Sequence, residues 1–573
     1  MTAEVITELN AASDLLRAAM GRYLKACIAM QNYSFKNHTH SHKLSIRAAS
    51  ELPLVASIES KFQQAKAAIS RTRNNSSSIS PVGALPPEIL SRIFHLVLQL
   101  SPRPCTSAFV WRQLPYTGES LISEHPDLLA HVCSRWRQVA ISDPTLWSHI
   151  NITPSLSPSQ KLLGRAQVYA ARADPLPLDI DIVDGVSSMH PDRRSPVAVN
   201  VTPVQFLASV ATRIRSLELI TQYPTTSQEE FISILITCFT LCVPGTLRRL
   251  TMLRKHSSDM GRISGRPCSL GNKLSFLSHD QQRLESILSS LNSLQLDGWY
   301  IDWSSRAYHG LTELHLTSVG LQTLYIFKSE LLAILKSSPA LRIFQFGLKM
   351  DNDIPDELET SILDVPVPLD NLEVLSLISV GHGSLGTVLQ ILAPGSKPLQ
   401  LSIDDPYKYA DEYLFTVIAQ FLARSNVTKL QVRARGSRDT RLTTGLLGLI
   451  PHLRALVLVG YSCDYIVSTS GLPFEFREPD KPYCLDALYV VCCRIFTHDG
   501  ALLQLVKKHS FQKLVFFECS FSGRLSPPAA ELEELRSTLS AFCPVVQFVR
   551  RDDPNPIEDW DIDPSVLEDF IWD

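Results

Sequence analysis

The chain has 573 residues, which is more than one ordinary domain holds unless that domain is a repeat array. Hydrophobic residues make up 45% of the chain and charged residues 19%, so it can bury a large core. The formal net charge of −3 argues against a general nucleic-acid binder, although a local basic patch is compatible with it.

Targeting signals and cysteine usage indicate an intracellular environment. Residues 1–20 carry acidic side chains and no basic segment before an apolar core, so no secretory signal is predicted. The longest apolar run, Phe231–Val243, is shorter than the roughly 20 residues of a membrane span, which favours a buried helix. The 12 cysteines are irregularly spaced, as expected for reduced thiols. We expect a cytoplasmic and/or nuclear protein without a membrane partner.

Residues 1–70 are predicted to form two helices. An apolar stripe at helical spacing defines the first one: Val5, Leu9, Leu16, Met20, Tyr23, Cys27 and Met30. After a break at Gln31–Lys43, a second stripe follows: Leu52, Leu54, Ile58 and Phe62. We expect both helices to pack on another surface, with a coiled-coil partner as the alternative. Residues 71–83 are polar, rich in Ser and Asn, and end in Pro and Gly, which predicts a linker.

Residues 84–150 read as a small helical module. Pro86 and Pro87 suit a helix start, where a missing N–H costs nothing, and Glu88 suits the helix dipole in the first turn. Apolar residues follow at helical spacing: Ile89, Leu90, Ile93, Phe94, Val97 and Leu98. After a Pro-rich interruption at Ser101–Asp127, a second apolar helix face comprises Val132, Trp136, Val139 and Ala140. Pro144 ends this helix, and a hydrophobic plug follows, formed by Leu146 and Trp147.

These segments together resemble the F-box, the helical module of substrate receptors in cullin-RING ubiquitin ligases. The resemblance is carried by Leu85-Pro86-Pro87-Glu88-Ile89-Leu90, Ile93-Phe94, Val132-Cys133, Trp136-Arg137, Asp143-Pro144 and Leu146-Trp147. A long insert between Gln99 and Leu129 departs from the usual pattern and resembles F-box proteins of mushroom-forming fungi.

The resemblance implies a set of residues that bind a Skp-type adaptor: Leu85, Pro86, Pro87, Ile89, Leu90 and Ile93, with Val132 and Trp136 completing the module. It also implies that Leu146 and Trp147 pack the module onto the rest of the chain. The structural alternative is that these apolar residues all belong to an intramolecular core. A helical module this small has little core, and surplus large apolar residues on it favour a docking surface.

A six-residue frame, apolar-x-x-apolar-x-apolar, recurs through residues 151–545. It occurs at Ile214–Leu219, Leu247–Met252, Leu291–Leu296, Leu311–Leu316, Leu341–Phe346, Leu372–Leu377, Pro398–Ile403, Val427–Val432, Leu453–Leu458, Leu485–Val490 and Phe511–Phe516. Helical segments precede several frames. A strand plus a helix at this period is typical of leucine-rich repeats, which bury their apolar faces by stacking.

The predicted fold class is therefore α plus α/β: a small helical F-box-like module, then a divergent leucine-rich-repeat-like solenoid of parallel strands with helices. An irregular α/β domain is the alternative, because the frames lack a regular Asn. Residues 546–573 are strongly acidic and carry Trp560, Phe570 and Trp572. They suit a solvated tail, a docking peptide or a cap on the last repeat, and a cap with a loose end is favoured.

No catalytic motif is recognised, and neither a cofactor nor a metal is expected. The alternating His38, His40 and His42 are more typical of a solvated tract than of a metal site. Cys492 and Cys493 would point to opposite faces of a strand, so they are interpreted as core thiols. One basic cluster is a candidate phosphate or substrate site, with a solvated solenoid edge as the alternative: Arg433, Arg435 and Arg438.

These patterns predict a non-enzymatic substrate receptor of an SCF-type cullin-RING ubiquitin ligase. The F-box-like module would bind the Skp-type adaptor and, through it, the cullin complex, while the solenoid would bind a protein substrate. Nucleic acid is not expected as a partner. The competing hypothesis is a leucine-rich-repeat scaffold that binds proteins without a ligase, and an unrecognised enzyme is the third class.

Overall fold

The fold comes from a computed structural model of the chain. It describes residues 2–37, 42–74, 81–100, 126–152, 159–184, 202–221, 228–254, 281–318, 325–351, 365–378, 380–404, 412–434, 441–442, 448–466, 483–495, 501–521, 529–550, 553, 556–557 and 560. The insert at 101–125, His38, His40, Arg435, Arg438, Phe570 and Trp572 lie outside these residues.

The chain divides into two compact units. The first contains Met1–Ile93 and Leu128–Val139, and the second contains Phe94–Asp127 and Ala140–Asp573. The division passes through the predicted 84–150 module instead of along its ends. The physical reason lies in the end of that module, which packs on the helix that follows it, as described below.

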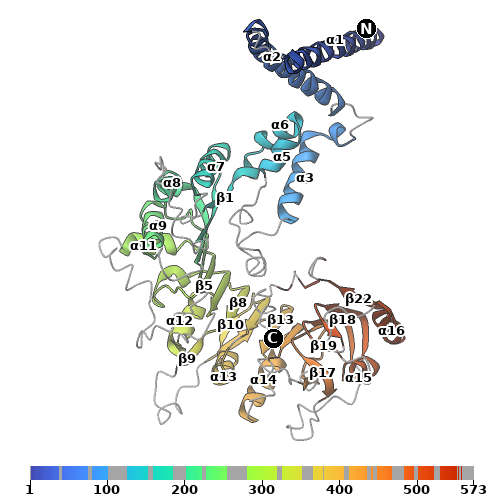
Figure 1. The fold of residues 1–573 in the computed structure, drawn as a ribbon. Coiled ribbons are helices and arrows are strands. Elements are labelled where there is room, and N and C mark those ends of the chain that lie inside the picture. Colours follow the sequence, from blue (N-terminus) through green and yellow to red (C-terminus); the bar gives the residue numbers. More distant parts are fainter. Residues whose placement is uncertain are drawn as a thin grey trace. The chain divides into compact units, whose positions relative to one another are not determined.

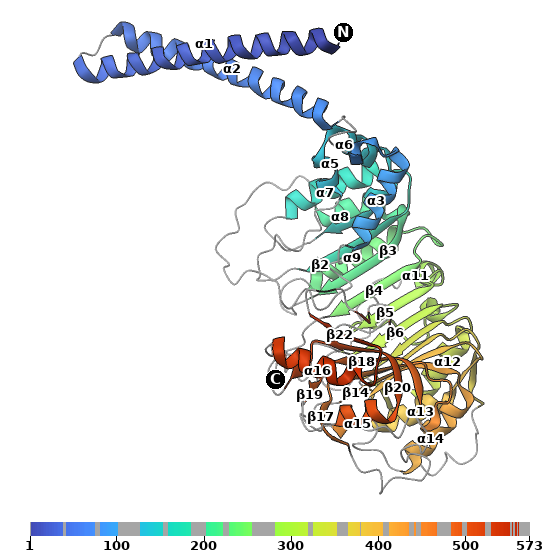
Figure 2. The same cartoon turned by 90° about the vertical axis from the view of Figure 1, so that its right-hand side faces the viewer.

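The first unit is helical, as predicted. It contains α1 (Thr2–Asn37), α2 (His42–Asn74), the 3-10 turn η1 (Pro81–Ala84), the start of α3 (Pro87–Leu100), most of α5 (Asp127–Val132) and the start of α6 (Ser134–Ser142). Helix α2 extends four residues into the predicted 71–83 linker, to Asn74. The long helices α1 and α2 form the hairpin seen in Figure 2, and the Tyr23 hydroxyl donates to the Glu51 carboxylate at 2.7 Å between them.

The apolar stripes of the hairpin are less buried than the sequence predicts. Val5, Leu9 and Leu16 are exposed, as are Leu52 and Leu54 on the second helix. Tyr23, Cys27 and Met30 are half-buried. The two helices therefore leave much of both apolar stripes exposed.

The second unit is built around one parallel sheet of 14 strands, whose order follows the chain from the first strand to the last (Figure 1). Its strands are β1 (His149–Ile152), β2 (Leu178–Asp184), β3 (Ile214–Thr221), β4 (Arg249–Arg254), β5 (Ser293–Asp297), β6 (Glu313–Thr317), β8 (Ile343–Phe346), β11 (Val374–Leu377), β13 (Leu399–Asp404), β14 (Val427–Arg433), β16 (Ala455–Val459), β18 (Cys484–Val491), β20 (Ser510–Phe517) and β22 (Val545–Val549).

Helices connect the strands and lie along the outer side of the curved sheet (Figures 1 and 2). They are α7 (Ser159–Arg172), α8 (Pro203–Val210), α9 (Gln228–Leu241), α11 (Gln281–Leu288), α12 (Lys328–Ser337), α13 (His382–Ile391), α14 (Glu412–Arg424), α15 (Ala501–Lys508) and α16 (Ala529–Ser540). Short 3-10 turns complete this unit: η2 (Pro144–Trp147), η4 (Ala211–Arg213) and η6 (Arg306–Tyr308). The architecture is α/β and solenoid-like.

The recurring frames account for the strands of the large sheet other than β1, β2 and β22. Each frame ends within a strand of the large sheet, and its fourth and sixth residues are buried on the helix side. Alternate residues of a strand point to opposite faces, so the third and fifth residues of the frame lie on the other face. The frame at Pro398 is shifted at its start: Pro398 is exposed, Leu399 is buried, and a register shift follows Leu399.

Smaller parallel sheets lie beside the main one. They pair β7 (Tyr325–Phe327) with β9 (Lys349–Asp351), and β10 (Val367–Leu369) with β12 (Leu392–Pro394). A four-stranded one contains β15 (Arg441–Leu442), β17 (Ser462–Ile466), β19 (Arg494–Ile495) and β21 (Ser520–Phe521). Sharp turns lead to three of these last strands, because Gly460, Cys492 and Glu518 have positive φ angles of 74°, 50° and 51°.

The turn at Cys492 changes the interpretation of the adjacent cysteines. β18 ends at Val491, so Cys492 and Cys493 follow the strand instead of lying within it. Cys493 is buried and its Sγ contacts the Val491 carbonyl oxygen at 3.2 Å, whereas Cys492 is only half-buried. Cys493 is thus a core thiol as predicted, and Cys492 is not.

None of the helices in the described part of the chain combines the length and the apolar character that a membrane crossing requires.

Candidate functional site

The helix α3 begins at the proline pair, as the sequence predicts. The Pro86 carbonyl accepts the N–H groups of Ile89 and Leu90, both at 3.1 Å, and Pro87 occupies the first helical position. A proline there loses no intrahelical hydrogen bond, and its fixed φ angle favours the helix.

The predicted adaptor-binding residues divide into three groups by exposure. Pro86, Pro87, Ile89 and Val132 are exposed, with 48% of Ile89 and 57% of Val132 accessible. Half-buried are Leu85, Ile93 and Trp136. Leu90 is 0% exposed and belongs to the core in this structure, so its role in adaptor binding stays a prediction. Helix α3 turns Leu90 and Phe94, four residues apart, into the core, and this leaves Ile89 outside.

Polar contacts hold the helices that carry these residues. Arg135 of α6 donates from Nη2 to the Leu85 carbonyl oxygen at 2.5 Å, just before α3. Arg137 donates from Nε to the Ala130 carbonyl oxygen of α5 at 3.0 Å. These hydrogen bonds hold the backbone of the short helices that carry the exposed apolar side chains. We call Ile89, Leu128 and Val132 the exposed helix residues.

The end of the predicted module belongs to the second unit. Trp147 is fully buried, and its Nε1 donates to the Ala140 carbonyl oxygen at 2.6 Å. The Tyr169 ring of α7 meets its indole edge-on at 5.0 Å, and the Arg172 guanidinium lies 4.2 Å from its ring centre. Leu146 is buried beside it. Both residues pack onto the following part of the chain, as predicted.

The sheet face opposite the helices carries a continuous row of matched residues, one per strand. We call this face the inner face. Strand register gives its middle row as Asn151, Asp181, Glu218, Thr251, Gln295, His315, Gln345, Ser376, Ser402, Gln431, Val457, Tyr489, Val515 and Gln547. The row is polar from β1 to β14 and then becomes apolar, before it ends in a glutamine on β22.

Neighbouring polar residues of the inner face bond across the strands. His315 Nδ1 lies 2.8 Å from Gln345 Oε1, and the Ser402 hydroxyl donates to Gln431 at 2.9 Å. His149 Nε2 lies 3.0 Å from an Asp181 carboxylate oxygen. These three pairs hold polar side chains on part of the inner face, and Asp181, Gln345, Ser402 and Gln431 among them are buried. Within the described residues, no group of three metal-ligating side chains occurs.

The only described member of the predicted phosphate cluster is committed to an ion pair. Arg433 lies at the end of β14 and is 4% exposed, and its Nε donates to Asp404 Oδ1 of β13 at 2.7 Å. A phosphate role of Arg433 would require this pair to open, and that role remains a prediction.

The apolar part of the inner face is covered by the segment that follows β22. Ile557 and Trp560 form one cluster with inner-face residues of three strands: Ala455, Val457, Val459, Ala487, Val491 and Phe517. Ile557 and Trp560 therefore contact strands well inside the sheet, and the predicted cap on the last repeat stays a prediction. The sequence carries a signal for this site, because the fifth frame residue changes from polar to apolar at Val457.

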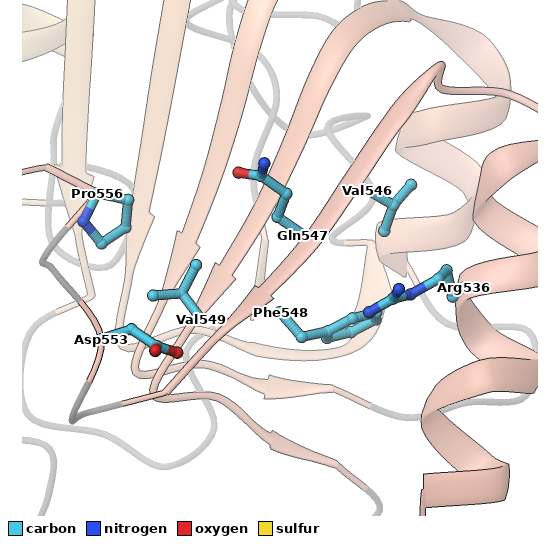
Figure 3. Close-up of a pocket in the computed structure, with 7 residues that line it drawn as sticks. All are labelled: Arg536, Val546, Gln547, Phe548, Val549, Asp553 and Pro556. Carbon is cyan, nitrogen blue, oxygen red and sulfur yellow. The ribbon is translucent and has the colours of Figure 1, made fainter.

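A small open pocket lies at the edge strand β22 (Figure 3). It is lined by Arg536, Val546, Gln547, Phe548, Val549, Asp553 and Pro556. Arg536 of α16 lies over the Phe548 ring at 5.5 Å from its centre, and Phe548 stacks on Phe516 at 4.9 Å. The lining includes four consecutive residues of β22, from both faces of the strand, so the pocket follows the sheet edge.

No known protein-family model matches the sequence, and no curated protein matches it either.

Proposed function

We propose that the protein is a non-enzymatic substrate receptor of an SCF-type cullin-RING ubiquitin ligase. The exposed helix residues and the proline pair at the start of α3 bind the Skp-type adaptor, and the inner face of the leucine-rich-repeat-like sheet binds a protein substrate. The protein contributes proximity: it raises the effective concentration of substrate lysines near the ubiquitin that a recruited enzyme carries.

The exposure of Ile89 and Val132 carries this proposal. Large apolar side chains on fixed helices are favoured as docking anchors, because burying each of them against a partner removes apolar area from water. The F-box resemblance of residues 84–150 names the partner. The inner face supplies the second interaction surface, with polar side chains already ordered by their neighbours.

A binding measurement with matched variants tests the proposal. We expect the Ile89→Ala/Val132→Ala chain to bind a purified Skp-type adaptor at least tenfold more weakly than the wild type, since an apolar anchor is commonly worth about 1–2 kcal/mol or more. The control is Leu96→Ala/Ile141→Ala, which removes two side chains that are 46% and 43% exposed and lie outside the predicted set. It should bind like the wild type.

The unfolding midpoints of all three chains show whether the variants remain folded. A wild-type chain that does not bind the adaptor, or two double variants that bind it equally, would refute the ligase proposal. The ligase-independent scaffold would then be the better account of the inner face.

A further inference from the structure

The chain places a tryptophan of its own on the inner face, several strands away from the edge of the sheet. After β22 it returns across that face, and Ile557 and Trp560 are 1% and 4% exposed. In the strand order β13-β14-β16-β18-β20-β22, the contacts of Trp560 lie on β13, β14 and β18. A cap that protects only the last strand would not need to reach this far.

Each contact of Trp560 uses a different chemical property. The Tyr489 ring meets the indole at 5.7 Å with an interplanar angle of 67°. The Lys429 ammonium lies 5.1 Å from its ring centre, within the range of a cation–π interaction. The Gln400 side-chain amide donates to its carbonyl oxygen. Aromatic, cationic and backbone-binding groups thus converge on one residue, as they do at a peptide-recognition site.

The surface beneath Trp560 has the apolar composition of a binding patch. Its residues occupy the third and fifth frame positions, which are polar on most earlier strands and here become Ala455, Val457, Ala487 and Tyr489. Without a cover these side chains would form a continuous apolar patch on the inner face, and such patches mark interaction sites. Trp560, which covers them together with Ile557, belongs to an acidic stretch of sequence, EDWDID at 558–563, and Lys429 and Lys513 lie on the same face.

We propose that this patch, from Gln400 to Phe517, is a binding site for an acidic, tryptophan-bearing peptide of a protein partner. Ile557 and Trp560 occupy it as an intramolecular ligand, and the partner must displace them. Because the tether keeps this ligand at high effective concentration, it weakens the apparent affinity of the partner. This proposal rests on the proposed function, because it specifies how the inner face binds a protein partner. It does not depend on adaptor binding.

A peptide supplied in trans tests the site. The probe is a fluorescently labelled peptide of residues 550–573, and its binding is followed by anisotropy against full-length chains. We expect Ile557→Ala/Trp560→Ala, which vacates the patch, to bind the probe at least about tenfold more tightly than the wild type. A probe carrying Trp560→Ala should not bind. The control chain is Tyr413→Ala/Val365→Ala, in which an exposed aromatic and an exposed aliphatic residue are removed elsewhere.

A second engineered chain tests the site even where the double variant does not fold. It carries a protease recognition sequence between Asp553 and Pro554, so that the segment is cut after the chain has folded and is then removed by dilution. Binding of the probe should appear only after cutting, and Lys429→Glu should weaken it. If the folded, cut chain does not bind the probe, or if the wild type binds it as tightly as the vacated chains, the segment is a structural cap and the proposal fails.

Failure of this proposal and failure of the proposed function give separate results. Adaptor binding is measured on Ile89 and Val132 variants, and peptide binding on variants of the inner face. A chain that binds the adaptor but never the probe retains the ligase function and loses only the peptide site.

Discussion

Glu373 shows how a single carboxylate stabilises the start of neighbouring strands. Its side chain accepts from Arg342 Nη2 at 2.6 Å and from Lys397 Nζ at 2.9 Å. The hydrogen bonds from Arg342 and Lys397 lower the pKa of Glu373 to about 2. A carboxyl group whose pKa is lowered in the folded state stabilises that state above its ordinary pKa, and this stabilisation disappears as the pH falls toward the folded pKa.

The Glu373→Gln substitution should therefore have a pH-dependent effect. At pH 6 the variant should unfold at a lower urea concentration than the wild type, because two cations lose their partner. Between an ordinary carboxyl pKa of 4.5 and the folded value of about 2, the difference should shrink, since the unfolded wild-type chain becomes protonated at Glu373 while the folded carboxylate is still ionised. Urea midpoints at pH 6, 4 and 3 measure it. A difference that stays constant with pH would contradict this account.

Truncation of two adjacent residues of α3 should change the stability by very different amounts. Leu90→Ala should destabilise the protein by about 2–5 kcal/mol, because it opens a cavity around a fully buried side chain. Ile89→Ala should change the stability by less than about 1 kcal/mol, since about half of that residue is already in water. Urea unfolding of both variants checks the pair. Similar losses in both would mean that α3 is rotated relative to the structure.

At the scale of elements, the small sheet β10-β12 depends on a close approach of two turns. A Cβ atom on Gly395, directly after β12, would lie 2.7 Å from both the Cα and the carbonyl oxygen of Asp370. Both are backbone atoms, so they cannot turn away as a flexible side chain would. Gly395 also donates its N–H to the Leu369 carbonyl oxygen at 3.4 Å.

Two glycine-to-alanine substitutions should separate this contact from the general effect of the exchange. Gly395→Ala should destabilise the protein by about 1–3 kcal/mol, because the turns must move apart. Gly383→Ala, in helix α13 with no atom within 4 Å of the new methyl group, should be neutral or stabilising by up to about 1 kcal/mol. Thermal unfolding of both chains gives the comparison, and a loss of equal size at both positions would argue against the close approach.

At the scale of the whole molecule, the sheet grows strictly in chain order, so each strand contacts the strands that precede and follow it. Most stabilising contacts of a repeat are consequently made with its neighbours. In such arrays stability is close to a sum of repeat and interface contributions, and local unfolding need not spread.

Hydrogen exchange should show this locality. Leu217→Ala in β3 should accelerate exchange in β2, β3 and β4 and leave β16 to β20 unchanged. Leu514→Ala in β20 should do the reverse. Both leucines are fully buried, so each substitution creates a comparable cavity. Faster exchange throughout the sheet in either variant would show instead that the unit unfolds as a single cooperative body.

The sequence alone predicted eleven of the 14 strands of the large sheet, all except β1, β2 and β22, because the signal of the frames is local. A frame with apolar residues at its fourth and sixth positions has the period of a strand, and repetition of the frame predicts strands that stack in order. The start of α3 at Pro87 and the burial of Leu146 and Trp147 were predictable for the same reason. Each depends on a few neighbouring residues.

Only the tertiary structure decided which side chains are buried and which residues distant in sequence are in contact. Periodicity places Ile89 and Leu90 in one helix, but only the orientation of that helix shows that Leu90 is core and Ile89 is exposed. Arg433 and Asp404 become an ion pair through the register of β13 and β14, across 29 residues of chain. Trp560 reaches Gln400 across 160 residues. Contacts of this range are set by where the folded chain returns, and a local pattern carries no information about that.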